Sequence, residues 1–510
     1  MSGMTGMGVL AMLVVALPAL GCLVLVALPG ERGNAVAQRL GVAVTGAVLG
    51  CAGALAAGFD ARGGLQAQTD LAWAPALGLR FHLGVDGISL PLVVMTALLG
   101  FLCLLYSARI MPEEGRPRAF VALLLLLEVG MIGTFLALDL LLFFVFFEVV
   151  LIPMYFLIAR WGIEGRGPAA YKFILYTLLG SAIMLLGFLL VYAEAGTFDI
   201  PELAALAEPG GAGLGRAAQV AAFLAIGLGL AVKTPMWPFH TWLPDAHTAA
   251  PTVGSVLLAG VLLKMGTYGF VRIAVPVLPE GALVLAPYLA AFGVIGIVYG
   301  ALACLAQRDL KRLIAYSSIG HMGFVLLGIA TLTPTGINGA LFANVAHGLI
   351  TGLLFFLAGA IKDRYDTSEF DALGGGLYAR APRLGGLVAF AAVASLGLPG
   401  LAGFWGELLV LLGAFDPAAG LDRGLYLAFL ALAGLGTVLT AGYFLVMVRR
   451  VCMGTGPGGG APGPAPVQDL TRVEVAAWAP LVVLILLAGL WPATLLGVTE
   501  PVVHALMGGG

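Results

Sequence analysis

The sequence predicts an all-α polytopic membrane protein with about 14 transmembrane helices. Hydrophobic residues make up 61% of the 510-residue chain and charged residues only 10%, against about 25% charged residues in a typical soluble domain. Apolar runs long enough to cross a bilayer, which takes about 20 residues, recur along almost the whole chain. A soluble globule of this length needs far more polar surface, so the soluble classes of protein are excluded.

Two of the expected membrane spans are too long for one straight helix. The seventh contains Pro235 and Pro238, and the twelfth contains Pro399 and Gly400. Proline interrupts helical hydrogen bonding, so we expect both helices to be broken inside the membrane. The fourteen spans lie near residues 7–28, 36–59, 88–108, 119–138, 140–159, 171–193, 217–247, 249–275, 282–304, 312–332, 336–361, 384–415, 424–448 and 475–497.

The charges in the connections predict the orientation. Counted together with the four residues at each end of a span, connections after odd-numbered spans carry 18 Lys or Arg residues, and those after even-numbered spans carry 5. Lys and Arg concentrate on the cytoplasmic side of membrane proteins, so both termini are expected on the outer side. No Lys or Arg precedes the first span, which predicts a retained helix and not a cleaved signal peptide.

Several function classes are disfavoured by composition. The formal charge of -2 gives no basic excess for nucleic acid. No Cys-x-x-Cys pair exists, so we expect no iron–sulfur cluster, zinc site or other metal on this chain. The Gly-rich stretches 211–215 and 454–466 do not follow a strand and open a helix, so no dinucleotide site is expected; 451–474 is predicted to be a cytoplasmic Gly/Pro linker.

The most informative residues are ionisable groups predicted to lie deep in the membrane. A charge at the bilayer centre costs roughly 2.5–3.5 kcal/mol on insertion scales, so such a group is paired, hydrated or functional. Five charged residues lie more than four residues from either end of a span, and four histidines fall inside the spans: Glu128, Glu148, Lys233, Lys264, Glu407, His240, His247, His321 and His347. We regard all nine as candidate proton-transfer residues.

Glu148 and Lys233 form the first candidate pair. Burial and mutual attraction can bring a Glu and a Lys into the range where protons exchange near neutral pH. Lys233 also precedes the break at Pro235, and broken helices at membrane depth face protein or water, which indicates a hydrated pocket. The structural alternatives are a permanently neutralised Glu148 and a Lys233 that only caps the carbonyls of the first half-helix.

Lys264 and Glu407 are candidates for the later steps. Lys264 lies near the middle of span 8, too deep to snorkel, and Glu407 follows the second break by two turns. His321 and His347 could bridge these two groups through water, because histidine exchanges protons near neutral pH.

The remaining candidates carry weaker signals. His240 and His247 are seven residues apart and share a helix face, where packing histidines are an equal alternative; the spacing is no common metal pair. Glu128 is a secondary member one span before Glu148.

The two broken helices suggest an internal repeat. Spans 4–8 (residues 119–275) and spans 9–13 (282–450) each hold five helices with the break in the fourth. Five is odd, so the second copy is expected to run inverted, as in transporters that place ion sites at broken helices. Residues 1–118 then form three N-terminal helices, and residues 475–510 form the last helix with the C-terminus.

The same residues carry a family resemblance. The segments 237–273 (WPFHTWLPDAHTAAPTVGSVLLAGVLLKMGTYGFVRI), 309–324 (DLKRLIAYSSIGHMGF) and 403–411 (GFWGELLVL) resemble the antiporter-like proton-translocating subunits of respiratory complex I. Within this family the chain is similar to the subunit M type of bacterial NADH–quinone oxidoreductase, the counterpart of mitochondrial subunit 4. The match spans roughly residues 120–450.

The resemblance implies specific roles and partners. The span-5 glutamate of the family falls on Glu148, its broken-helix lysine on Lys233, its central lysine on Lys264, and its terminal group, a glutamate in the M type, on Glu407. The chain would be a subunit of an NADH:quinone oxidoreductase in the bacterial plasma (inner) membrane, with L-type and N-type neighbours. FMN, iron–sulfur clusters and quinone are expected on partner subunits and no redox site on this chain.

Two other hypotheses remain at this point. A subunit of a multisubunit cation/proton antiporter would share the fold and the first three residues, but Glu407 and the M-type segments disfavour it. An inert membrane scaffold would use its buried charges only to fix helix register.

Overall fold

The computed structural model describes residues 6–112, 115–208, 211, 213–454 and 468–508. Within these residues, 13 helices are long and apolar enough to cross a membrane. The shorter helices α19 (Pro382–Ser395) and α20 (Ala402–Phe415) together make the predicted twelfth span. The predicted all-α membrane fold is therefore confirmed. Most of the predicted linker, 455–467, lies outside the described residues.

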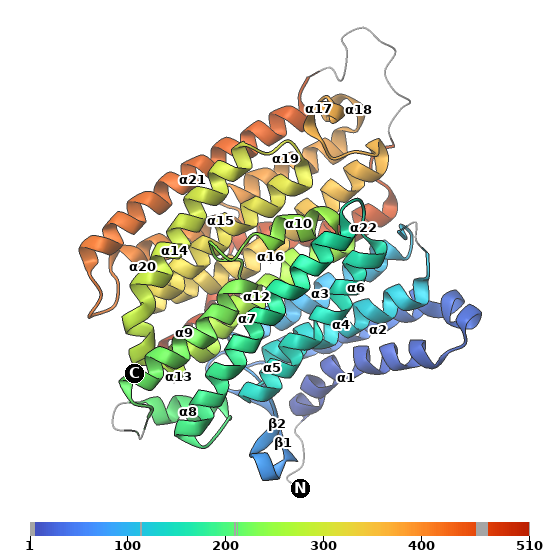
Figure 1. The fold of residues 1–510 in the computed structure, drawn as a ribbon. Coiled ribbons are helices and arrows are strands. Elements are labelled where there is room, and N and C mark those ends of the chain that lie inside the picture. Colours follow the sequence, from blue (N-terminus) through green and yellow to red (C-terminus); the bar gives the residue numbers. More distant parts are fainter. Residues whose placement is uncertain (1–5, 113–114, 209–210, 212, 455–467, 509–510) are drawn as a thin grey trace.

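The chain runs back and forth as long helices packed side by side, with α14 against α15, α7 against α9 and α16 against α20 (Figure 1). The helices up to residue 277 are α1 Gly6–Ala27, α2 Gly30–Gly58, α3 Leu90–Ser107, α4 Pro117–Leu136, α5 Leu140–Val149, α6 Leu151–Trp161, α7 Arg166–Ala195, α8 Ile200–Ala207, α9 Arg216–Lys233, α10 Trp242–Ala249, α11 Thr252–Leu257, α12 Leu263–Gly269 and α13 Val275–Val277. The later helices are α14 Pro279–Leu305, α15 Leu310–Ala330, α16 Pro334–Tyr365, α17 Phe370–Leu373, α18 Leu377–Arg380, α21 Arg423–Cys452, α22 Arg472–Leu490 and α23 Ala493–Leu506.

Both predicted helix breaks are present. The first separates α9 from α10 at residues 234–241, and the second separates α19 from α20 at 396–401. Two of the differences from the predicted boundaries have a local cause. Span 5 divides between α5 and α6, because Pro153 cannot donate to the carbonyl four residues earlier. The last span ends at Leu490 instead of residue 497, just before Pro492.

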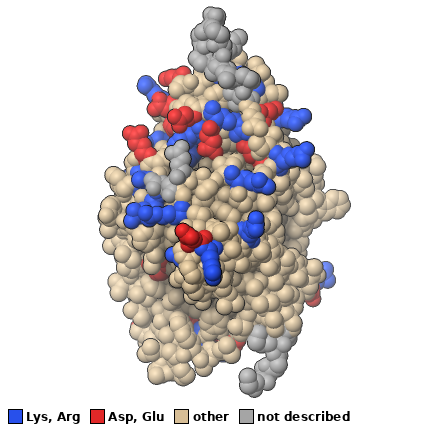
Figure 2. Space-filling view, turned by 90° about the vertical axis from the view of Figure 1, so that its right-hand side faces the viewer, with Lys and Arg blue, Asp and Glu red and all other residues tan. Residues whose placement is uncertain are grey.

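The two ends of the helix bundle differ in charge. Figure 2 shows that Lys, Arg, Asp and Glu gather over its upper end, while the lower end is mostly uncharged. We call the charged end the basic face; it carries connections such as 306–309 and helices α17 and α18. The opposite face carries α8, the start of α1 and the end of α23 (Figure 1). An even number of membrane crossings requires the start of the first helix and the end of the last to share a face, as they do.

A β-hairpin that the sequence patterns did not predict lies on the opposite face. Its antiparallel strands are β1 (Gln66–Ala74) and β2 (Leu79–Val85), joined by a turn over Pro75–Leu77. β2 becomes fully buried toward its end, and the backbone N–H of Leu138 donates to the His82 carbonyl at 2.9 Å. The hairpin is thereby joined to the connection between α4 and α5.

One short backbone bridge occurs twice, at opposite ends of the bundle. Asp139 pairs with Asp199 beside α8, and Asp309 pairs with Glu369 beside α17, 170 residues later. The hydrogen bonds also match, with Leu140 N–H donating to Phe198 O and Leu310 N–H to Ser368 O, both at 2.9 Å. Figure 1 places α8 and α17 at opposite ends. An inverted repeat predicts this arrangement; the repeat itself stays a prediction.

Asp139 is the capping residue of α5 as well as a bridge residue. Its buried carboxylate accepts from the N–H groups of Leu141 and Leu142 at 2.9 and 3.0 Å. We expect Asp139→Ala to lower the free energy of unfolding by about 1–2 kcal/mol, since caps of this kind contribute that much. Thermal denaturation of the purified complex measures the loss. Asp422→Ala, which removes one cap bond to Leu425 N–H at an exposed helix start, should have a smaller effect; an equal loss would contradict the argument.

Candidate functional site

The nine candidate residues fall into two clusters and three outlying groups. The first cluster joins α5 to α9. The Glu148 carboxylate lies near Ser181 of α7 and interacts electrostatically with Lys233. The Lys233 ammonium lies 4.7 Å from the centroid of the Phe147 ring, in cation–π range. Within the described chain it has no hydrogen-bond partner, so the acid and the amine face each other without a direct bond.

The second cluster is a continuous row of four groups. The Nζ atom of Lys264 lies 2.6 Å from Nδ1 of His347. The rings of His347 and His321 are 5.4 Å apart between centroids, and Nδ1 of His321 lies 3.4 Å from Oε1 of Glu407. The row crosses from the eighth span to the twelfth through α16 and α15. Neighbouring members of the row are either in direct contact or separated by a single short gap.

A small cavity lies at the Glu407 end of this row. It measures about 20 Å³ and is lined by His321, His347, Ser395 and Glu407 among others. This volume holds about one water molecule, and the polar lining offers the two to four partners that a buried water needs. Nε2 of His321 also lies 3.0 Å from Oγ of Ser395, at the second helix break.

The helix that carries Lys264 is irregular on both sides of it. Leu258–Leu262 and Phe270–Ala274 are π-helical turns, which recur at functional sites. The Lys264 ammonium donates to the carbonyl of Ala259 in the first of them. The second wide turn holds Arg272, which forms a buried ion pair with Asp86 at 2.5 Å and a hydrogen bond to the Tyr268 hydroxyl at 3.1 Å. Lys264 is thus held between two anchored wide turns.

The two clusters meet at a tight contact between α9 and α12. A Cβ atom built on Gly266 would lie 2.6 Å from the Leu230 carbonyl oxygen, so the helices approach more closely than a side chain would permit. Thr234, directly after Lys233, lies at the same contact. No direct hydrogen bond joins Lys233 to Lys264 in the described residues. The sequence analysis predicted one relay that contains both lysines, whereas in the structure Lys233 and Lys264 lie in neighbouring clusters.

Three candidates lie outside both clusters. His240 packs edge-on against Tyr299, with 4.9 Å between ring centroids. His247 stacks on Phe355 at 4.4 Å and lies within electrostatic range of Lys264. Glu128 is 1% exposed, and neither of its carboxylate oxygens has a partner in the part of the chain that the structure describes. It lies against Gly100 of α3.

Lys311 is a buried lysine that the sequence patterns missed. It directly precedes span 10 (312–332), so the sequence predicts a residue of the connection. It is 2% exposed, and its Nζ lies 3.3 Å from the Ala250 carbonyl oxygen at the end of α10. A cavity of about 1160 Å³ on the basic face reaches Lys311 and residues 250–253, where the span of Lys264 begins. Ser181 and Ser395 were also missed, since isolated serines in apolar spans carry no motif.

Comparisons with known proteins place the chain in a family. Residues 137–447 match the family described as NADH:quinone oxidoreductase/Mrp antiporter, TM. The chain is 43% identical over 461 residues to NADH-quinone oxidoreductase subunit M of Rhodobacter capsulatus, covering 89% of this chain and 87% of that relative.

Two solved structures share the fold. A chain of respiratory complex I from Thermus thermophilus with bound NADH matches with a TM-score of 0.86 and 33% identity, covering 98% of this chain and 100% of that one. A chain of the Mrp complex from a Dietzia species matches at 0.85 with 24% identity, covering 99% and 98%. From the helix breaks, the buried acids and amines and these likenesses together, the chain belongs to the NADH:quinone oxidoreductase/Mrp antiporter transmembrane family.

Proposed function

We propose that this chain is a proton-translocating membrane subunit of an NADH–quinone oxidoreductase. The observation that carries the proposal is the row from Lys264 through His347 and His321 to Glu407, in which each group lies within direct or single-water reach of the next. The relative from Rhodobacter capsulatus is named subunit M of such an enzyme. Amines, imidazoles and carboxylates that meet in an apolar interior are suited to passing protons.

Protons are taken up from the basic face. The large cavity there brings solvent to Lys311 and to residues 250–253. His247 follows, since its ring lies in electrostatic range of both Lys311 and Lys264. The cavity therefore ends one histidine away from the start of the row. By the distribution of Lys and Arg, this face is the cytoplasmic one in a bacterial inner membrane, and the termini are on the outer side.

The Glu148–Lys233 cluster supplies the switch. Two unit charges about 6 Å apart at an effective dielectric near 20 interact by about 2.8 kcal/mol. Moving one charge through 100 mV requires about 2.3 kcal/mol. The interaction energy gained or lost when Glu148 and Lys233 move together or apart is therefore large enough to control the transfer of one proton. The tight packing of α9 on α12 at Gly266 passes that change to the helix of Lys264.

Other subunits supply the energy. We propose that FMN, the iron–sulfur clusters and quinone lie in partner subunits, and that L-type and N-type neighbours flank this chain in the membrane. A multisubunit cation/proton antiporter would use the same fold. The M-type terminal glutamate, Glu407 facing His321, favours the oxidoreductase. A scaffold role would leave the contiguous Lys264–Glu407 row without a use.

The proposal predicts a loss of pumping in Glu148→Gln. Glutamine keeps the shape of the side chain but removes the charge that acts on Lys233. In the assembled complex, we expect the number of protons translocated per NADH oxidised to fall, while ferricyanide reduction by the peripheral subunits stays unchanged. Glu194→Gln, at an exposed position of α7, serves as the matched control. An unchanged proton yield in Glu148→Gln would contradict the switch.

A further inference from the structure

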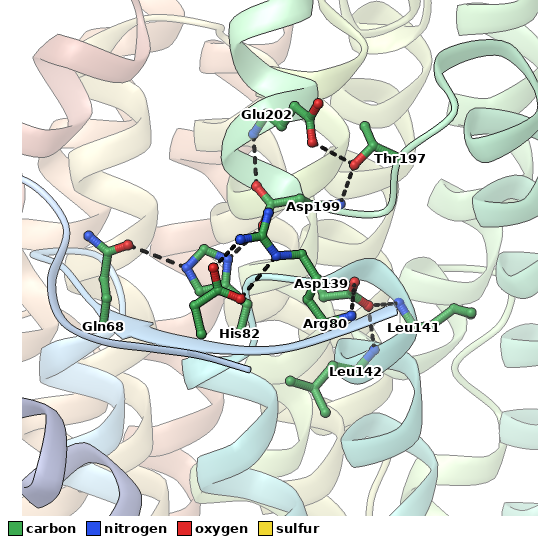
Figure 3. Close-up of polar contacts among 10 residues, drawn as sticks. Gln68, Arg80, His82, Asp139, Leu141, Leu142, Thr197, Asp199 and Glu202 are labelled. Atoms are coloured by element: carbon green, nitrogen blue, oxygen red, sulfur yellow. Dashed lines mark hydrogen bonds and ion pairs between the residues drawn. The ribbon is translucent and has the colours of Figure 1, made fainter. Parts of the chain in front are cut away.

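A further polar cluster, separate from the two described above, lies on the opposite face and joins three segments that are distant in sequence (Figure 3). Its centre is His82 of strand β2, whose Nδ1 lies 2.6 Å from Oδ2 of Asp199. Both side chains are nearly inaccessible, at 8% and 6% exposed. Asp199 also caps α8 by accepting from Glu202 N–H at 3.1 Å. The contact therefore holds the hairpin against the start of α8.

The second ring nitrogen of His82 also faces an acceptor. Nε2 lies 3.3 Å from Oε1 of Gln68 on strand β1. The Gln68 amide cannot be reversed without loss, because its Nε2 donates to the Leu65 carbonyl at 3.2 Å. A neutral imidazole has one N–H and can serve only one of the two oxygens, whereas an imidazolium serves both. The two oxygens that face the ring nitrogens therefore fit a protonated ring, which can donate to both.

The surrounding charges act in the same direction. Arg80 of β2 lies 3.9 Å from Asp199 and is paired with Asp70 of β1. From the α4–α5 connection comes Asp139, and from α8 comes Glu202, which lies in electrostatic range of Arg80. Helix α1, residues 129–136 of α4 and the first turns of α5 contribute no Asp, Glu, Lys, Arg or His. Burial alone would raise the pKa of Asp199, but the hydrogen bond from His82 and the nearby Arg80 lower it.

We propose that His82 and Asp199 form a proton-binding clasp that fastens the hairpin to the connections before α5 and α8 when the solution at the opposite face is acidic. Protonation of His82 turns its bond to the Asp199 carboxylate into an ion pair and adds a second hydrogen bond, from Nε2–H to Gln68 Oε1. Hydrogen bonds with an ionised partner are roughly twice as strong as neutral ones. The backbone completes the clasp, since Leu138 N–H donates to His82 O and Ile200 N–H to Leu138 O at 2.9 and 2.8 Å. The clasp lies at the start of the helix that carries Glu148, and it stands independently of the relay.

Hydrogen–deuterium exchange of residues 66–85 in the assembled complex tests the clasp. With rates corrected for intrinsic exchange, we expect protection of the hairpin to fall about five- to tenfold as the pH rises through the histidine range, the difference between a charged and a neutral hydrogen bond. His82→Gln, which cannot gain a proton, should lose this step. His504→Gln removes an exposed histidine that lies 3.8 Å from Glu500 on α23 and should keep it. A step that persists in His82→Gln would overturn the proposal.

A second variant keeps the test sharp if His82→Gln does not assemble. Gln68 is exposed, so Gln68→Glu should fold, and a carboxylate beside His82 Nε2 should move the midpoint of the step upward by about 1 pH unit or more. Gln68→Met, which removes the acceptor, should move it downward. Midpoints that are the same in both variants would overturn the clasp. Because the readout is exchange and not translocation, it fails or succeeds separately from the proposed function.

Discussion

Replacing Lys264 with methionine should stop proton transfer through this chain. Methionine fills a similar volume but cannot bind a proton, and it breaks the 2.6 Å contact with Nδ1 of His347. Loss of a positioned proton donor typically slows transfer by about 10²–10⁴-fold. We therefore expect the complex to assemble, to oxidise NADH, and to translocate fewer protons per electron pair. Reconstituted proteoliposomes with a pH-sensitive dye measure the ratio.

The control for this variant is Lys172→Met, which removes a partly exposed lysine near the start of α7 that pairs with Asp245 outside the row and the cavity. It should leave the proton yield unchanged. Stability gives a second readout, because Lys264 is 0% exposed and replacing a buried charge with an apolar side chain is often neutral or stabilising. A Lys264→Met complex that is stable and still pumps at the full ratio would show that the lysine serves only packing.

The second large effect concerns the buried ion pair between Arg272 and Asp86. Arg272→Met should destabilise the protein by about 3–5 kcal/mol, since it leaves an uncompensated carboxylate in the interior. Asp86 keeps only its bonds from the N–H groups of Ile88 and Ser89, both at 3.0 Å. The loss should appear as a lower midpoint of thermal denaturation and a lower yield of assembled complex.

The double variant Asp86→Asn/Arg272→Met separates charge from packing. Asparagine can still accept from Ile88 N–H through its amide oxygen, and no net charge then remains buried. We expect the double variant to recover most of the stability that Arg272→Met loses. If the double variant is as unstable as the single one, the loss comes from the packing of Arg272 on the Tyr268 ring, 5.5 Å away, and not from the unpaired charge.

The spans and breaks were predictable because hydropathy and proline act locally. Pro235 and Pro399 interrupt their helices wherever the neighbouring helices lie, and both breaks occur as expected. The depth of Glu148 and Lys264 followed from their place in the apolar runs. These features need no knowledge of which helix packs on which.

The pairing between His82 and Asp199 was not predictable from the sequence alone. These residues are 117 positions apart, and only the packing of the segments brings them together, whereas His347 was already expected to lie beside Lys264. The hairpin was missed for a different reason. Leu71, Trp73 and Leu77 are exposed apolar residues of the hairpin, so the pattern lacks the alternation that marks a strand with one buried face.

The wide turns on either side of Lys264 have a mechanical consequence. Each π-helical turn accommodates one surplus residue in the helix. When a surplus residue travels along a helix, each side chain that it passes rotates by about 100°, the angular step at 3.6 residues per turn. Lys264 lies between the two π-helical turns, so a surplus residue that moves from one turn to the other passes it. The Lys264 ammonium then rotates from one neighbouring helix toward another, while both ends of the helix stay fixed.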